Sequence, residues 1–238
     1  MIYKLGKRPA KFDSRNIRLR DVLRSDMPTM PDEHDFDDSH PGIPTPMFCN
    51  DQLGCCVMSG RGHATLRFED LEQNIIIPIS EDDVRVEYFA ETGGGDDGLC
   101  LLDSLKEWRK KGWVAANKRY LIEGFAEIDW QNAEEVREAI YSDTGVMLGV
   151  QLPSDAMAQF EAGQPWAVSG ATGEPLGLHC VYCPAYNPTG PVVVTWGRKQ
   201  QATWEWFNAN CDEAYAVIDA PDKVDAVRLR RKLEAVTA

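Results

Sequence analysis

The chain lacks the features of a membrane-spanning or nucleic-acid-binding protein. No apolar run approaches the roughly 18 residues that crossing a bilayer requires. The start, MIYKLGKR, carries charge with no apolar segment behind it, so we expect no signal peptide and, by default, a cytoplasmic protein. Basic residues number 25 against 38 acidic ones, a formal net charge of -13, which argues against nucleic acid or an anionic membrane as a partner.

Cofactor signals are also missing. The glycine-rich loop at residues 93–98 has neither the lysine nor the Ser/Thr of a phosphate-binding loop, so we expect no nucleotide cofactor. The seven cysteines are an odd number without a secretion signal, which favours reduced thiols. What remains is an ordinary globular composition, 43% hydrophobic and 26% charged, in a chain of 238 residues that can bury a substantial core.

Periodicity divides the chain into a helical part and a strand-rich part. Residues 1–45 are proline-punctuated and predict an extended N-terminal arm. Apolar spacing of three and four, with caps, predicts several helices, and short apolar runs after residue 145 predict strands. The helices are expected at 55–73, from Ser80 through Phe89, at 101–111, at 132–141 and within 221–238; the strands at 146–150, 178–186, 192–195 and 214–218.

Helices first and strands second predict an α+β protein with two facing subdomains. We expect one domain at residues 46–220, with a helical part at about 46–145 and a β part at about 146–220. The basic helix at 221–238 is expected to dock on the body or on a partner.

The most informative segment is residues 50–60, NDQLGCCVMSG. Cys56 stands where a loop becomes the first long predicted helix, and a thiol at a helix N-terminus has its pKa lowered by the helix dipole. Gln52 lies four residues upstream, and a side-chain amide there is a donor for a developing oxyanion. The pattern indicates a nucleophile site if a histidine meets the sulfur.

Four segments resemble the papain-like cysteine peptidases. Residues 98–112 are similar to the segment where related chains carry an Asp-Ala-Leu helix before a short loop. Residues 52–56 are similar to the oxyanion glutamine followed by the nucleophile at the head of the central helix. Residues 177–186, GLHCVYCPAY, are similar to the strand that carries the base histidine, here His179, and residues 192–197, VVVTWG, to the next strand and its Asn-Ser-Trp-Gly end. The resemblance covers about residues 45–218. It implies an N-terminal helical subdomain with a long central helix and a C-terminal antiparallel β subdomain.

The resemblance also implies a mechanism and a substrate class. Cys56 would attack an acyl carbon as a thiolate, and His179 would take and return the proton. Gln52 and the Cys56 backbone amide would hold the oxyanion, and Trp196 would shield the histidine from water. The substrate would be a peptide or an amide, and the chemistry needs no cofactor.

Three positions depart from the family pattern. Gln52 is closer to Cys56 than in well-known members, and Cys55 replaces a small polar residue. The orienting asparagine falls on Val194, which cannot accept a hydrogen bond from imidazole. Thr195 is expected to point to the opposite face of its strand. Asn187 would reach the histidine only if its turn folded back, so the third triad member is expected to be absent or atypical.

Other cysteines and histidines have competing interpretations. Cys180 and Cys183 have the spacing of a zinc ligand pair, but residues three apart on a strand point to opposite faces, so we expect no metal site. His63 lies about two helical turns beyond Cys56 and is too far to be the base. His34 and His40 are expected to be exposed within the acidic arm.

Two functions from different classes follow. The first is a thiol hydrolase, a peptidase or amidase, that uses Cys56 and His179. The second is a structural or binding protein with little catalysis. The segment NDQLGxC resembles phage and prophage proteins, and this resemblance implies a virion location and other protein subunits as partners. A cleft open to solvent beside Cys56 would favour the enzyme, and a cleft buried by the arm would favour the scaffold.

Overall fold

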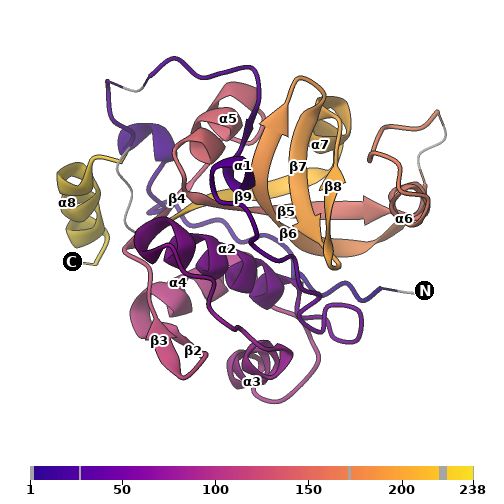
Figure 1. Ribbon diagram of the computed structural model, residues 1–238, viewed down its shortest axis with the longest axis horizontal. Helices are drawn as coiled ribbons and strands as arrows, with labels where there is room; N and C mark the ends of the chain where they lie inside the picture. The colour runs from indigo at the N-terminus through magenta and orange to yellow at the C-terminus, as the bar shows by residue number, and fades with distance from the viewer. Residues whose placement is uncertain (1–2, 27, 171–172, 220–223, 238) are drawn as a thin grey trace.

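The computed structural model describes residues 3–26, 28–170, 173–219 and 224–237. Figure 1 shows two halves side by side, with helices α2, α3 and α4 in the lower half and most of the β-sheet with α5, α6 and α7 in the upper half. The N-terminus lies at the right of the view, at the level where the two halves meet. This is the predicted α+β architecture, helical first and antiparallel β second.

In the described residues, the helical half is built from helices α2, α3 and α4, of which α3 has a side-chain N-cap. Helix α2 (Cys56–Gln73) is buried along most of its length because it lies between the other helices and the sheet. Helix α3 (Glu81–Thr92) has Ser80 as its N-cap and forms a capping box, in which Ser80 and Asp83 satisfy each other's backbone amides. Helix α4 (Leu101–Lys111) buries its apolar face and ends in three basic residues that favour the negative end of its dipole.

Within the described residues the main sheet has seven strands. Six of them follow the order β4-β9-β5-β6-β7-β8, and the seventh, β1, pairs with β6. The pairings of this sheet are all antiparallel. The strands are β1 (His34–Asp35), β4 (Gly124–Glu127), β5 (Gly145–Pro153), β6 (Pro175–Asn187), β7 (Gly190–Thr195), β8 (Arg198–Gln201) and β9 (Cys211–Ile218). A separate hairpin joins β2 (Trp113–Ala115) to β3 (Lys118–Tyr120).

Alternate residues of the central strands enter two different cores. On β6, Cys180 and Tyr182 pack with α2 and α4, whereas Val181 and Cys183 pack on the opposite face. That second core is covered by α5 (Ala133–Tyr141), α6 (Ser154–Glu161) and α7 (Trp204–Asn210). The face on which a β6 side chain stands therefore decides which half of the molecule it meets.

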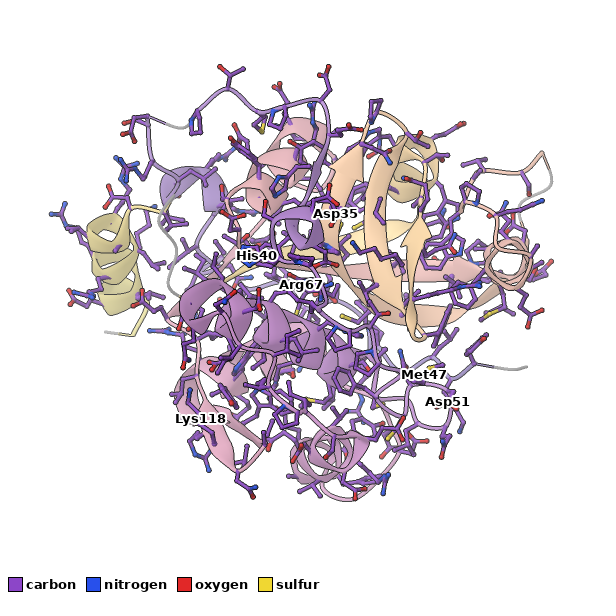
Figure 2. The ribbon with its side chains drawn as sticks, viewed as in Figure 1. Asp35, His40, Met47, Asp51, Arg67 and Lys118 are labelled. Carbon is purple, nitrogen blue, oxygen red and sulfur yellow. The ribbon has the colours of Figure 1, made fainter. Side chains whose placement is uncertain are left out.

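The arm is more closely packed than its sequence predicts. Besides η1 (Leu19–Asp21), it forms α1 (Phe36–Ser39) against α2, where Asp37 pairs with buried Arg67 at 2.7 Å. His40, expected to be exposed, stacks on Phe36 and lies 2.7 Å from Asp70. Figure 2 shows Asp35, His40 and Arg67 gathered where α1 meets α2.

The expectation of exposure was wrong for His34 as well. Its side chain is only 18% exposed and stacks edge-on against Tyr141. Both histidines are covered because β1 and α1 bring this stretch of the arm against β6, α2 and α5, a long-range pairing that local polarity does not reveal.

Several elements had no sequence prediction. Strands β2, β3 and β4 lie in the segment expected to be helical, and β4 joins the sheet by pairing with β9. Helices α6 and α7 and strand β8 are also additions. Helix α8 (Ala226–Thr237) packs on the body through buried Leu229, close to Gly124 of β4. Over the described ranges, no helix combines the length and apolarity needed to cross a membrane.

Candidate active site

Cys56 is the first residue of α2 and lies where the helical half meets β6. Its sulfur is completely buried and accepts a hydrogen bond from the backbone N–H of Cys180, at 3.4 Å. The Gly6 backbone N–H also hydrogen-bonds to it. Cys180 is the residue after His179, so the fold brings the predicted nucleophile beside the segment that carries the predicted base.

His179 is fully buried between an aromatic ring and a hydroxyl. The Trp196 ring stacks on the imidazole with a centroid distance of 4.4 Å and an interplanar angle of 16°. The Nε2 atom lies 2.7 Å from Thr195 Oγ1. The other ring nitrogen, Nδ1, has no hydrogen-bond partner within the described part of the chain. If Nε2–H donates to Thr195, the Nδ1 lone pair is free to accept a proton.

The expectation that Thr195 points away from the histidine was wrong. Tyr182 pairs directly with Val194 across β6 and β7, and residues paired in this way share a face of the sheet. His179, three residues before Tyr182, stands on the other face, and so does Thr195. Thr195 therefore occupies the place beside the imidazole that the family pattern assigned to position 194.

Burial reverses the expected ionisation of the pair. Desolvation raises the pKa of the Cys56 thiol, and the amides of Cys180 and Gly6 and the charge of Lys7 only partly offset it. Desolvation also lowers the pKa of His179 to about 3. The predicted thiolate at a helix N-terminus is thus not the form present here, since the loss of water outweighs the helix dipole. Cys56 is therefore a neutral thiol and His179 a neutral imidazole.

We predict that His179 makes stability fall on acidification. Its pKa is about 3 in the folded protein and about 6.5 when unfolded, so the unfolded chain takes up a proton first as pH falls below 6.5. Over two pH units, from 6.5 to 4.5, this costs about 2–3 kcal/mol. Urea unfolding of wild type and His179→Gln at pH 7.5 and 4.5 measures it. The variant should lose that much less stability than wild type, and equal losses would contradict the assignment.

A segment of the chain's own arm covers the site. The covering segment, residues 3–8, runs along the Leu99 backbone: Leu99 N–H donates to the Gly6 carbonyl at 2.9 Å and Arg8 N–H donates to the Leu99 carbonyl at 2.8 Å. On the other side, Lys7 N–H donates to the Leu178 carbonyl at 3.2 Å. At its start, the Tyr3 ring stacks on Trp196 with a centroid distance of 4.8 Å.

Glycines make this close passage possible. A Cβ on Gly6 would lie 1.8 Å from the Gly54 carbonyl oxygen, and a Cβ on Gly98 would lie 2.0 Å from the Gly6 carbonyl oxygen. Asp96 and Tyr88 connect the two loops, because Asp96 accepts from Gly54 N–H and from the Tyr88 hydroxyl, both at 2.8 Å. The glycine-rich loop, which lacked a nucleotide signature, thus forms one wall of the path taken by the arm.

Two of the predicted site residues lie outside this group. The Gln52 side chain is exposed, whereas Asn50 of the same loop is buried with its Oδ1 unpartnered in the described chain. The short spacing of Gln52 from Cys56 was the sequence signal for this difference. Asn187 supports the β6–β7 turn, since its Oδ1 accepts from Thr189 N–H and its Nδ2 donates to Gln201. It does not contact His179.

The remaining cysteines and histidines form no second site. All seven cysteines are free thiols. Among the residues described, no cluster of three His, Cys, Asp or Glu side chains could hold a metal ion. His63 is buried on α2 against Phe48, with a centroid distance of 5.1 Å.

Comparison with solved structures identifies the architecture. Xylellain, a cysteine protease from Xylella fastidiosa, superposes with a TM-score of 0.72 over 92% of this chain and 98% of its own, at 13% identity. The chain has a papain-like fold. Procathepsin B S9 from Trypanosoma congolense gives a TM-score of 0.65 at 12% identity over 92% of this chain and 86% of its own.

A plant enzyme extends the papain-like comparison. The Carica candamarcensis cysteine protease CMS1MS2 gives a TM-score of 0.63 at 11% identity, covering 80% of this chain and 99% of its own. No family model and no curated protein matches the sequence. At these identities the likeness establishes the papain-like fold, and the chemistry must be argued from the site itself.

Proposed function

We propose that the protein is a papain-like thiol hydrolase, a peptidase or amidase, whose site is covered by its own residues 3–8. The observation that carries the proposal is the arrangement around His179. Its Nε2 lies 2.7 Å from Thr195 Oγ1, and the Trp196 ring stacks on one face of the imidazole. Its Nδ1 has no hydrogen-bond partner in the described chain, and the next residue, Cys180, contacts the Cys56 sulfur. By accepting a hydrogen bond from Nε2–H, the Thr195 hydroxyl fixes the tautomer in which Nδ1 is free to act as the base. Thr195 thereby takes the role of the missing asparagine.

The proposed reaction follows from these positions. His179 Nδ1 takes the proton of the Cys56 thiol as the sulfur bonds to the acyl carbon, and the resulting imidazolium gives that proton to the departing amine. Water then attacks the thioester with His179 as the base, which releases a carboxylic acid and restores the thiol. The Cys56 backbone amide is the first oxyanion donor. We propose Asn50, in place of exposed Gln52, as the side-chain donor, on the strength of its burial.

The chemistry requires the covering segment to leave. Its backbone contacts are the two bonds to Leu99, the bond to Leu178 and the amide of Gly6 on the sulfur. Once the covering segment has left, a substrate peptide can form backbone hydrogen bonds with Leu99 and Leu178 in its place. Uncovering also readmits water, which removes the cause of the raised thiol pKa and the lowered imidazole pKa.

The test is turnover by the full-length chain. Wild type and Gly6→Ala, in which the covering segment cannot sit as it does, are incubated with a mixed peptide library under reducing conditions. Mass spectrometry then follows new peptide termini and an acyl adduct on Cys56. Cleaved peptides with an adduct confined to Cys56 are expected. Absence of both in a folded Gly6→Ala chain whose Cys56 reacts with iodoacetamide would overturn the proposal.

One observation favours the alternative, a structural or binding protein with little catalysis, for which phage or virion membership is one form. The covering segment buries Cys56 and His179 completely, and the pair is not hydrogen-bonded. This is the outcome expected of a scaffold. If Cys56 stays unreactive after the segment is displaced, with the fold intact, the scaffold is the better description.

A further inference from the structure

Lys7 is a fully buried lysine in a segment that is otherwise at the surface of the cleft. Its side chain is 0% exposed, and its Nζ lies 2.8 Å from Asp212 Oδ2 and 2.8 Å from Glu213 Oε1. The Nζ also donates to the Arg8 carbonyl at 3.3 Å. The two carboxylates belong to the body of the protein, on β9, whereas the ammonium is brought in by the arm from 205 residues away.

A bulge in β9 directs both carboxylates into one space. Gly149 of β5 pairs with Glu213, and the next residue, Val150, pairs with Cys211. Asp212 is therefore an extra residue between them, as in a β-bulge, and bulges commonly re-aim side chains beside active sites. Without the bulge, Asp212 and Glu213 would point to opposite faces of the sheet.

The space that Lys7 fills depends on Gly149. A Cβ at this position would lie 2.2 Å from Lys7 Cε and 2.7 Å from Glu213 Cγ. A side chain at 149 would close the pocket. The missing side chain at Gly149 thus leaves room for the aliphatic stem of Lys7 next to the two carboxylates.

The pocket has more negative charge and more acceptors than Lys7 uses. Two carboxylates face one ammonium, and Asp212 Oδ1 is buried without a hydrogen-bond partner in the described ranges. The Tyr215 hydroxyl donates a hydrogen bond to the Glu213 carboxylate. Desolvation and the neighbouring Asp212 raise the pKa of Glu213, which is the cost of holding two acids together. A guanidinium has five N–H donors in a planar fork, so it can bond to both carboxylates and also to the Asp212 oxygen that an ammonium leaves free.

The pocket adjoins the proposed nucleophile. Lys7 follows Gly6, whose amide hydrogen-bonds to the Cys56 sulfur, and the Lys7 amide bonds to the Leu178 carbonyl, one residue before His179. The Lys7 charge acts on the Cys56 thiol. A residue in this pocket is thus one position along the chain from the atoms that would react.

We propose that Asp212 and Glu213, with Gly149, form a specificity pocket for a lysine or arginine side chain of the peptide that replaces the covering segment. Lys7 is the internal occupant of that pocket. The inference rests on the proposed function for the identity of its ligand as a substrate, and on the geometry of β5 and β9 for its charge preference. If the ion pair served only to fasten the arm, one carboxylate would be enough, and the pocket would not need the unpartnered Asp212 Oδ1.

The test measures protection of Cys56 from iodoacetamide, which requires no turnover. The acetylated, amidated peptide YKLGKR, which corresponds to residues 3–8, is added to full-length Gly6→Ala, together with versions carrying arginine, norleucine or glutamate at the Lys7 position. The lysine and arginine peptides should halve the labelling rate at concentrations at least about tenfold lower than the norleucine peptide, since a hydrogen bond to a charged group contributes ~1.5–3 kcal/mol. The glutamate peptide should protect least.

The matched control carries Asp212→Asn and Glu213→Gln in the same chain. In this chain the lysine and norleucine peptides should protect Cys56 equally, because the two substitutions keep the shape of the pocket and remove its charge. Equal protection by those two peptides in the chain that retains both acids would overturn the pocket. If basic peptides protect better but no peptide is cleaved, the hydrolase proposal fails and the specificity pocket stands. If peptides are cleaved without any preference for basic side chains, the pocket fails and the hydrolase proposal stands.

A second comparison avoids Gly6→Ala if that chain does not fold. In the otherwise native chain, Lys7→Arg should leave the Cys56 labelling rate within about twofold of wild type, whereas Lys7→Met should raise it about tenfold. If arginine releases the segment as readily as methionine does, the pocket does not select basic side chains.

Discussion

Replacing Cys56 with serine is expected to lower peptide hydrolysis by at least about 10⁴-fold, the scale seen when a nucleophile that acts as part of a unit is removed. A serine hydroxyl ionises far less readily than a thiol, so a neighbouring base activates it less. It would therefore be a far weaker nucleophile than the thiol. The comparison is made by kcat/KM on one cleaved peptide, in the wild-type and Gly6→Ala backgrounds.

Cys55→Ser is the matched control. Cys55 is the adjacent residue, is equally buried, and donates its thiol hydrogen to the Phe48 carbonyl at 3.2 Å. A serine hydroxyl can make that bond, so hydrolysis should stay within about threefold of wild type. Similar losses in both variants would mean that the start of α2 is structurally disturbed. Activity retained by Cys56→Ser would remove Cys56 from the reaction.

The elements that local signals define were predictable. Helix α4 spans the predicted residues 101–111, and α5 begins after Asn132, whose side chain accepts from Glu134 N–H as a cap does. The four predicted strands lie within β5, β6, β7 and β9. Caps and apolar periodicity are decided within a few residues, so one sequence is enough to recognise them.

The geometry around His179 was not predictable in the same way. Cys56 and His179 could be named from motif order, but the partner of the imidazole depends on the register of β6 against β7, which pairs Tyr182 with Val194. The strands β2 and β3 could not be predicted for the same reason, because each is only three residues long and is defined by its pairing with the other. Register is a tertiary property.

Ionisation at Cys56 depended on a contact still more distant in sequence. The helix N-terminus predicts a lowered thiol pKa, and that electrostatic argument holds when water can reach the sulfur. Residues 3–8 exclude water, and nothing in their sequence, YKLGKR, indicates a partner in β6 or beside Leu99. The pairing of Lys7 with Asp212 spans nearly the whole chain. Only the folded structure could reveal that the arm enters the site.

Substituting Gly6 with alanine is expected to uncover Cys56 and raise its rate of reaction with iodoacetamide by up to the order of 100-fold. The added Cβ would lie 1.8 Å from the Gly54 carbonyl oxygen and 2.2 Å from its carbonyl carbon, a clash with backbone that no side-chain rotation relieves. Overpacking of this kind costs about 1–3 kcal/mol, which the chain avoids if the covering segment moves out. Water then reaches the sulfur, and the thiol pKa falls toward its usual range.

The rate is measured at Cys56 by mass spectrometry of its peptide, with buried Cys183 as an internal reference in the same sample. Cys183 lies in the core on the far face of the sheet, and burial raises its pKa to about 12, so its labelling reports global opening and should not change. Gly170→Ala is the control variant, because no atom lies within 4 Å of a Cβ built there. A folded Gly6→Ala chain with unchanged Cys56 labelling would contradict the covering role. A parallel rise at Cys183 would mean that the substitution had loosened the whole fold. A rise at Cys56 alone is the result that separates a removable cover from a permanent part of the core.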